Sequence, residues 1–112
     1  MKLKPWQWLL LAVCAVVSAA VLHRDYQIAE GQKIYDRLGC ATCHLAGGAP
    51  SLEHVGRKYD RQTFVDWLSN PETIYARLGR KPLNAGYPPM PRLQEVSHRD
   101  IELLSYLLSA QR

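Results

Sequence analysis

Residues 38–48 read LGCATCHLAGG and contain two of the chain's three cysteines. Cys40 and Cys43 are three positions apart, and His44 follows the second directly. Three chemistries use such a pattern: covalent attachment of a haem, one half of a zinc site, or a thiol–disulfide redox pair. The rest of the chain has to distinguish between them.

Haem attachment fits this spacing best. Two cysteines three residues apart on a helical turn reach the two vinyl groups of a haem, and the next residue presents its imidazole to the iron. A thioredoxin-like pair is expected among alternating strands and helices, and no convincing strand pattern is present. Zinc needs four ligands, so that alternative must recruit a further histidine from His23, His54 and His98.

An apolar run without charge, Pro5 to Leu22, follows Lys2 and Lys4. It is long enough to cross a bilayer, and it also resembles a signal peptide in which residues 18–20 (SAA) form the cleavage site. Both interpretations place the remainder outside the cytoplasm. We therefore expect a signal-anchor or transmembrane segment at residues 1–22 and a single-haem domain at residues 23–112.

The pattern of apolar residues beyond this run predicts helices and no sheet. Apolar side chains recur at intervals of three and four, and proline and glycine residues fall between the periodic segments. Gly31 lies inside the first of these helices, where we expect another backbone to approach closely. The expected helices are Tyr26–Leu38, a helix capped by Asp60 and ended by Asn70-Pro71, Pro71–Leu78, and a last helix opened by the capping-box pattern Ser97 to Asp100.

A second axial ligand for the iron is predicted at Met90. Residues 80–95 contain four prolines and should form a stiff, extended loop in which Met90 is held between Pro89 and Pro91. His54 and His98 are the weaker candidates because a surface loop and a first helical turn expose them to solvent. Ligation by His44 and Met90 leaves no open position on the iron, and the thioether favours the ferrous state, which suits electron transfer.

The charge of the domain is too mild for nucleic-acid binding. Of 14 basic residues two precede the apolar run, which leaves 12 against 10 acidic ones. The basic residues nevertheless form two groups that could favour an acidic docking partner. These groups are Arg57, Lys58 and Arg61, and Arg77, Arg80 and Lys81.

Four segments together resemble the class I c-type cytochromes. They are GQKIY at 31–35, CATCH at 40–44, YPPMPRL at 87–93 and IELLSYLL at 101–108, and the resemblance covers residues 27–110. It implies an all-α fold, a small helical bundle around one covalently bound haem c, here preceded by one N-terminal hydrophobic helix. It also implies that the first and last helices cross, with Gly31 and Tyr35 on one and Tyr106 on the other.

The resemblance further implies contacts to the cofactor. Pro50 and Leu52 match the segment that covers the histidine side of the haem, where the proline carbonyl accepts the ring N–H of the axial histidine. Arg57, Tyr59 and Trp67 match a region whose polar groups bond a haem propionate.

We expect an electron carrier rather than an enzyme. It would lie in the inner membrane by a single span with the haem domain in the periplasm, or be soluble in the periplasm after cleavage. Expected partners are the membrane and redox proteins such as a terminal oxidase, a reductase, a dehydrogenase or a cytochrome bc complex, and no nucleic acid. The alternatives are a haem gas sensor or peroxidase with an open iron site, and a zinc-binding structural module.

Overall fold

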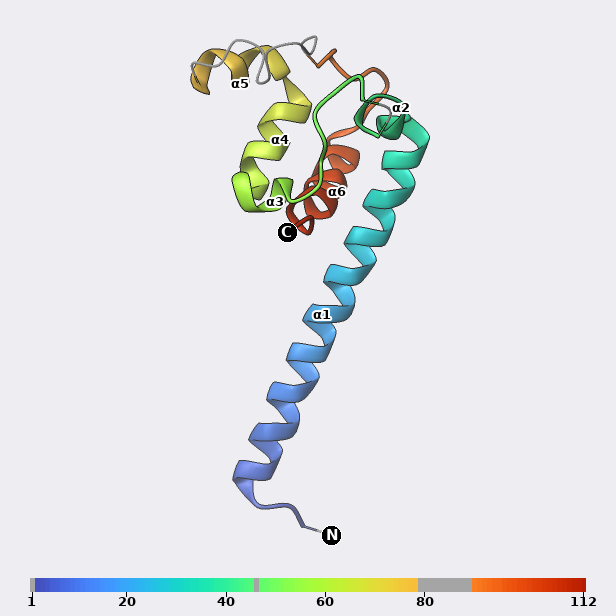
Figure 1. Ribbon diagram of the computed structural model, residues 1–112. Coiled ribbons are helices and arrows are strands. Elements are labelled where there is room, and N and C mark those ends of the chain that lie inside the picture. Colours follow the sequence, from blue (N-terminus) through green and yellow to red (C-terminus); the bar gives the residue numbers. More distant parts are fainter. Residues whose placement is uncertain (1, 46, 79–89) are drawn as a thin grey trace.

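The computed structural model describes residues 2–45, 47–78 and 90–112, and none of these residues lies in a strand. The all-α prediction is confirmed. The helices are α1 (Pro5–Leu38), α2 (Cys40–His44), α3 (Val55–Lys58), α4 (Arg61–Ser69), α5 (Pro71–Leu78) and α6 (His98–Ser109) (Figure 1). Each expected helix is found, and α3 is an additional helix that the sequence did not predict. The predicted loop at 80–95 lies outside the described residues as far as residue 89, and residues 90–95 are not helical.

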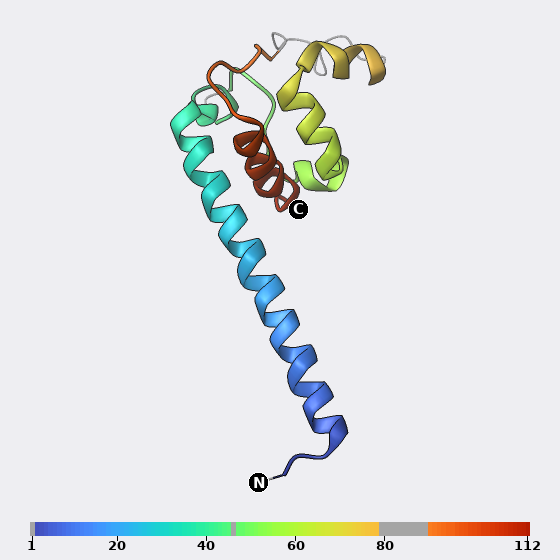
Figure 2. The ribbon, with the colours of Figure 1, turned by 180° about the vertical axis from the view of Figure 1, so that it is seen from behind.

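Helix α1 joins the apolar run and the first helix of the domain without a break. It contains 34 residues, about 51 Å at 1.5 Å per residue. Pro5 stands at its first turn, where proline is tolerated, and residues 23–25 between the two predicted segments contain neither glycine nor proline. The N-terminal half of α1 therefore projects from the bundle as a straight arm (Figures 1 and 2).

The C-terminal half of α1 packs against α6 at Gly31. A Cβ atom added to Gly31 would collide with the carbonyl oxygen of Leu103 and lie 3.1 Å from the Cβ of Leu107. The close approach predicted at this glycine is confirmed. An ion pair also joins the two helices, because Arg37 Nη2 lies 2.7 Å from Asp100 Oδ2.

The core lies between α1, α4 and α6. Asp60 caps α4 by accepting a hydrogen bond from the Thr63 backbone N–H at 2.8 Å, as predicted. The apolar stripe of α4 then faces α6, and burying these side chains supplies the hydrophobic stabilisation of the bundle. The core residues are Ile34, Phe64, Val65, Leu68, Ile101, Leu103, Leu104 and Leu108.

The start of α6 is fixed by the predicted capping box. The Ser97 hydroxyl accepts from the Asp100 N–H at 3.1 Å, and the Asp100 carboxylate accepts from the Ser97 N–H at 3.3 Å. Both satisfy backbone donors that the first turn of a helix leaves unpaired. The cap thus determines where the loop carrying Met90 gives way to helix.

Candidate cofactor and metal site

The two cysteines lie on a helix that starts immediately after α1. Gly39 connects the helices with φ of 70°, a left-handed conformation that strains any residue with a side chain. Its backbone N–H donates to the Asp36 carbonyl at 3.2 Å, which closes α1. Cys40 and Cys43 are then one helical turn apart on α2, half-buried and exposed respectively, so both sulfurs face the same side.

His44 is oriented by the loop that follows it. Its Nδ1 atom lies 2.7 Å from the carbonyl oxygen of Pro50. Because a carbonyl oxygen only accepts, Nδ1 carries the proton and Nε2 keeps a lone pair for a metal. The Cys43 carbonyl accepts from the N–H groups of Gly48 and Ala49, both at 3.1 Å, and this turn brings Pro50 back to the ring.

The thiol of Cys40 differs from those of redox-active cysteines. Its burial raises the pKa of the thiol, and the nearby Asp36 carboxylate acts in the same direction. Thiol–disulfide exchange uses thiolates whose pKa is lowered. Cys40 is therefore a neutral thiol in the free chain, which disfavours the redox-pair alternative.

The other histidines, His23, His54 and His98, are exposed, and the last two lie beside carboxylates. The Nε2 atom of His54 is 3.4 Å from Glu53 Oε1, and that of His98 is 3.1 Å from Glu102 Oε1. Within residues 2–45, 47–78 and 90–112, no three His, Cys, Asp or Glu side chains are grouped so that they could hold a metal ion. The described residues thus do not supply the four-ligand set that the zinc alternative requires.

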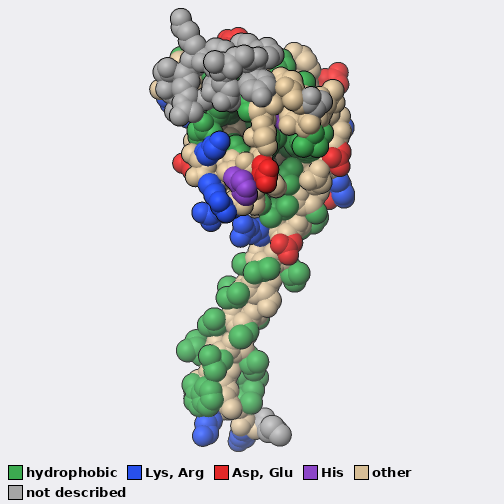
Figure 3. All heavy atoms as spheres, viewed as in Figure 1, with side chains coloured by type: hydrophobic (Ala, Val, Ile, Leu, Met, Phe, Trp, Pro, Cys, Tyr) green, Lys and Arg blue, Asp and Glu red, His purple; other side chains and the backbone are tan. Residues whose placement is uncertain are grey.

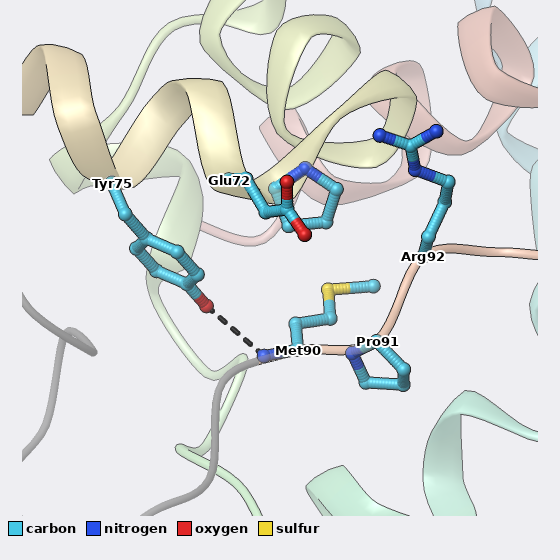
Figure 4. Close-up of a pocket in the computed structure, with 6 residues that line it drawn as sticks. Glu72, Tyr75, Met90, Pro91 and Arg92 are labelled. Carbon is cyan, nitrogen blue, oxygen red and sulfur yellow. Dashed lines mark hydrogen bonds between the residues drawn. The ribbon is translucent and has the colours of Figure 1, made fainter.

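Three aromatic rings lead from the core towards Met90. Tyr59 and Trp67 meet edge to face with centroids 5.4 Å apart, and Trp67 meets Tyr75 in the same way at 5.9 Å. The Tyr75 hydroxyl accepts the backbone N–H of Met90 at 3.1 Å (Figure 4). Tyr75 is a site residue that the sequence did not single out, because a tyrosine on a short helix gives no indication of a partner 15 residues away.

Met90 lies at the rim of the core and on the wall of a pocket of about 530 Å³. The other residues lining this pocket come from the start of α5 and the segment after Met90 (Figure 4). They are Pro71, Glu72, Tyr75, Pro91 and Arg92. The predicted axial ligand is therefore half-buried, with its backbone held by α5.

The candidate propionate contacts divide into two groups. Tyr59 and Trp67 are half-buried and in contact, whereas Arg57 is exposed on α3. Helix α3 lies beside the end of α6, where the Gly56 N–H donates to the Gln111 carbonyl at 2.7 Å. In both views this end of the domain is the one away from α2 (Figures 1 and 2).

The donor set and its surroundings fit a haem. Two thiols can form thioethers, the Nε2 of His44 and the sulfur of Met90 can ligate iron, and a partly exposed apolar rim adjoins the core. A flat apolar macrocycle would cover such a rim and remove it from water. Besides Met90, the partly buried residues of the rim include Leu38, Leu52, Val55, Tyr59, Leu93 and Val96.

Comparison with protein-family models gives a match to the family described as "Cytochrome c", over residues 28–111. Comparisons with curated proteins and with solved structures give no significant match. The matched range begins inside α1, and it contains the two cysteines, His44 and Met90.

Proposed function

The chain belongs to the cytochrome c family, and from this premise we propose that it is a membrane-anchored electron carrier whose iron is ligated by His44 and Met90. Membership of the family implies one covalently bound haem c and a role in electron transport rather than enzymatic turnover. The bound haem supplies an iron that alternates between the ferrous and ferric states. The polypeptide provides attachment, orientation and exclusion of water.

The hydrogen bond between His44 and the Pro50 carbonyl is the observation that carries the ligation proposal. It keeps the proton on Nδ1 and fixes the ring, so that Nε2 is presented to a metal without a change of tautomer. Cys40 and Cys43, on the same turn of α2, would attach the porphyrin next to this nitrogen. Helix α2 thus supplies one proposed iron ligand and both proposed attachment points, and the loop after it fixes the tautomer of that ligand.

On the opposite side of the iron, Met90 is the proposed ligand. Its backbone N–H is bonded to the hydroxyl of Tyr75, and Tyr75 packs against Trp67. This support stiffens the backbone at Met90, which helps the thioether to remain bound in both oxidation states. With His44 and Met90 both bound, the iron would offer no site for a substrate, which suits electron transfer.

Tyr59 and Trp67 are the proposed contacts of a haem propionate. Tyr59 is half-buried at the rim of the core and Trp67 is half-buried against it, and a hydroxyl and an indole N–H can donate to a carboxylate. Leu52, half-buried on the same rim, would cover the histidine face of the porphyrin.

The N-terminal half of α1 is the proposed membrane anchor. By length and composition α1 is long and apolar enough to span a bilayer, and its apolar part is fully exposed, although a signal sequence meets the same criteria. Lys2 and Lys4 favour a cytoplasmic N-terminus, which puts the haem domain in the periplasm. The alternative is a soluble periplasmic form cut after residues 18–20, which lie within continuous helix.

Redox proteins of the membrane are the proposed partners: a terminal oxidase, a reductase, a dehydrogenase or a cytochrome bc complex. A tether keeps the carrier at high local concentration beside such complexes, so weak docking is sufficient.

Two measurements on the purified full-length protein test the proposal. We expect the reduced protein at neutral pH not to bind carbon monoxide, because both axial positions are filled; rapid binding would instead favour the gas sensor or peroxidase. We expect the intact mass from washed membranes to equal the whole chain plus one haem. A mass lacking about 20 N-terminal residues would identify the cleaved form.

A further inference from the structure

Helix α1 holds the domain close to the end of the proposed membrane span, and the inference below rests on that anchor. Leu22 ends the apolar run, and Ile28, six residues later, is already partly covered by the domain. Six helical residues rise only about 9 Å. Because no loop or glycine intervenes between these residues, the domain cannot lift away from the bilayer surface as a flexibly tethered domain could.

One end of the bundle faces the membrane in this arrangement. In both ribbon views α3 and the C-terminal end of α6 lie on the side towards the N-terminal half of α1, and α2 lies at the far side (Figures 1 and 2). The hydrogen bond from Gly56 to Gln111 holds α3 against the chain end. A Cβ atom at Gly56 would also collide with the carbonyl oxygen of Ser109, so the contact is tight.

This end carries exposed basic side chains. Arg57 and Lys58 are exposed on α3, and Arg112 is exposed next to Gln111. Figure 3 shows Lys and Arg side chains gathered at the edge of the domain nearest the arm. We call Arg57, Lys58 and Arg112 the basic end.

Two carboxylates lie close in sequence to the basic end, and both are engaged. Glu53 lies 3.4 Å from His54. Asp60 accepts hydrogen bonds from the backbone N–H and the hydroxyl of Thr63, at 2.8 and 2.6 Å. These contacts do not cancel the two negative charges, so the three cations of the basic end exceed the nearby carboxylates by one.

We infer that the basic end rests on the anionic phospholipid headgroups of the membrane that holds α1. Basic side chains within a Debye length of an anionic bilayer are attracted to it, and α1 keeps these residues inside that distance. The short rise between Leu22 and Ile28 leaves little room for a protein partner beneath the domain. The exposed position of Arg57 fits this role better than the contact with a propionate that the family resemblance implies.

This contact has a consequence for electron transfer. The basic end faces the lipid, so α2, with Cys40 and Cys43, is presented on the side away from the bilayer surface. Redox partners therefore meet the haem from above or beside the domain, in an orientation that the lipid contact keeps constant.

The test uses the full-length haem protein in lipid nanodiscs. Amide hydrogen exchange of residues 55–58 is compared between discs of phosphatidylcholine alone and discs that also contain phosphatidylglycerol. A four-residue helix opens readily, so the exchange rate of its amides should fall measurably when lipid headgroups cover it. We expect roughly tenfold slower exchange in the anionic discs, lost at high salt and in a variant carrying Arg57→Glu and Lys58→Glu. Arg99→Glu, a single charge reversal at the opposite end of α6, serves as the control for the single reversal Arg57→Glu and should keep the protection.

Each other outcome is informative. Equal exchange in both kinds of disc would overturn the inference, as would protection that appears only when an acidic redox partner is added. Protection that survives the double substitution would do the same. Failure of the protein to co-elute with discs of either composition would refute the membrane anchor itself, so the two proposals fail in distinguishable ways.

Discussion

His44 Nδ1 lies 2.7 Å from the backbone carbonyl oxygen of Pro50, six residues further along the chain. A backbone carbonyl cannot be removed by substitution, but its position depends on the rigidity of proline in a loop that contains Gly47 and Gly48. Pro50→Ala should therefore loosen this hydrogen bond. We expect a loss of about 0.5–1 kcal/mol in unfolding free energy, because alanine gives the unfolded chain more freedom.

The same variant should raise the reduction potential. A looser hydrogen bond makes Nε2 a weaker donor and stabilises ferric iron less. Redox titration followed by absorbance measures the change. Leu45→Ala is the control, because Leu45 adjoins His44 but its side chain is 79% exposed. An unchanged potential in the proline variant would mean that the carbonyl does not tune the ring.

Met90→Ala should open one axial position of the iron. The reduced variant should bind carbon monoxide near stoichiometrically, and its potential should fall by on the order of 0.1 V, because the thioether no longer stabilises the ferrous state. Absorbance spectra with and without the gas, together with redox titration, measure both effects. Arg92→Ala alters the same pocket without removing a ligand and should behave as the native protein does. If Met90→Ala kept a closed iron, another residue would have to be the ligand.

Gly31→Ala should destabilise the bundle. The added methyl group collides with the Leu103 carbonyl, so α1 and α6 must separate. Overpacking of this kind costs about 1–3 kcal/mol, against a gain of up to about 1 kcal/mol from the higher helix propensity of alanine. We expect a net loss of about 1–2 kcal/mol, measured by denaturant unfolding in detergent with haem absorbance as the probe.

Gly48→Ala is the matched control for this experiment. A Cβ atom at Gly48 would meet its nearest neighbour, the Cys43 carbonyl oxygen, at an ordinary 3.8 Å. Its unfolding free energy should lie close to that of the native protein. Equal stability of the two variants would contradict the close helix contact at Gly31.

The ion pair between Arg37 and Asp100 should make stability depend on acid pH. The hydrogen bond from the Arg37 guanidinium lowers the pKa of Asp100 below its ordinary value of 3.8, and the bond from the Ser97 backbone adds to this effect. The folded state therefore binds the proton only at lower pH than the unfolded state does. The stabilisation is complete above the unfolded pKa and is lost as pH falls through the folded pKa.

Asp100→Asn should flatten this acid limb of the stability curve. At neutral pH the loss should be about 0.5–1 kcal/mol, because a partly exposed ion pair and one cap each contribute modestly. Denaturant unfolding at a series of pH values between about 2 and 7 measures it. Glu102→Gln removes a carboxylate from the same helix outside the cap and should leave the slope in place. A slope that persists in Asp100→Asn would assign it to other groups.

Much of the fold follows from local patterns in the sequence. Asp60 and Ser97 cap the helices that start directly after them, α4 and α6, so these two starts follow from capping chemistry. Helix α5 begins at Pro71 as expected. The sequence did not predict α3, because four residues are too few to show a helical period. The residue that precedes this helix, His54, also has a φ of 61°, which is unusual for a residue other than glycine.

The site divides in the same way. Cys40, Cys43 and His44 can be proposed as haem-binding residues because their spacing matches the shape of the cofactor, and Met90 can be proposed as a ligand because prolines flank it. The link from Met90 through Tyr75 to Trp67 depends on how α5 packs, which no local pattern encodes. The change of hydropathy after residue 22 predicts a boundary between two segments. In the structure α1 runs through this position as one continuous helix.

If α1 is the membrane span that we propose, its continuity fixes the rotational orientation of the haem domain relative to that span. Each residue inserted between Leu22 and Ile28 would turn the domain by about 100° around the helix axis and raise it by about 1.5 Å. Seven added residues would nearly restore the original heading, whereas two would point the haem towards the opposite neighbours in the bilayer plane. The number of residues in this short stretch would therefore determine the direction, within the bilayer plane, that the haem faces and in which it passes electrons to a partner.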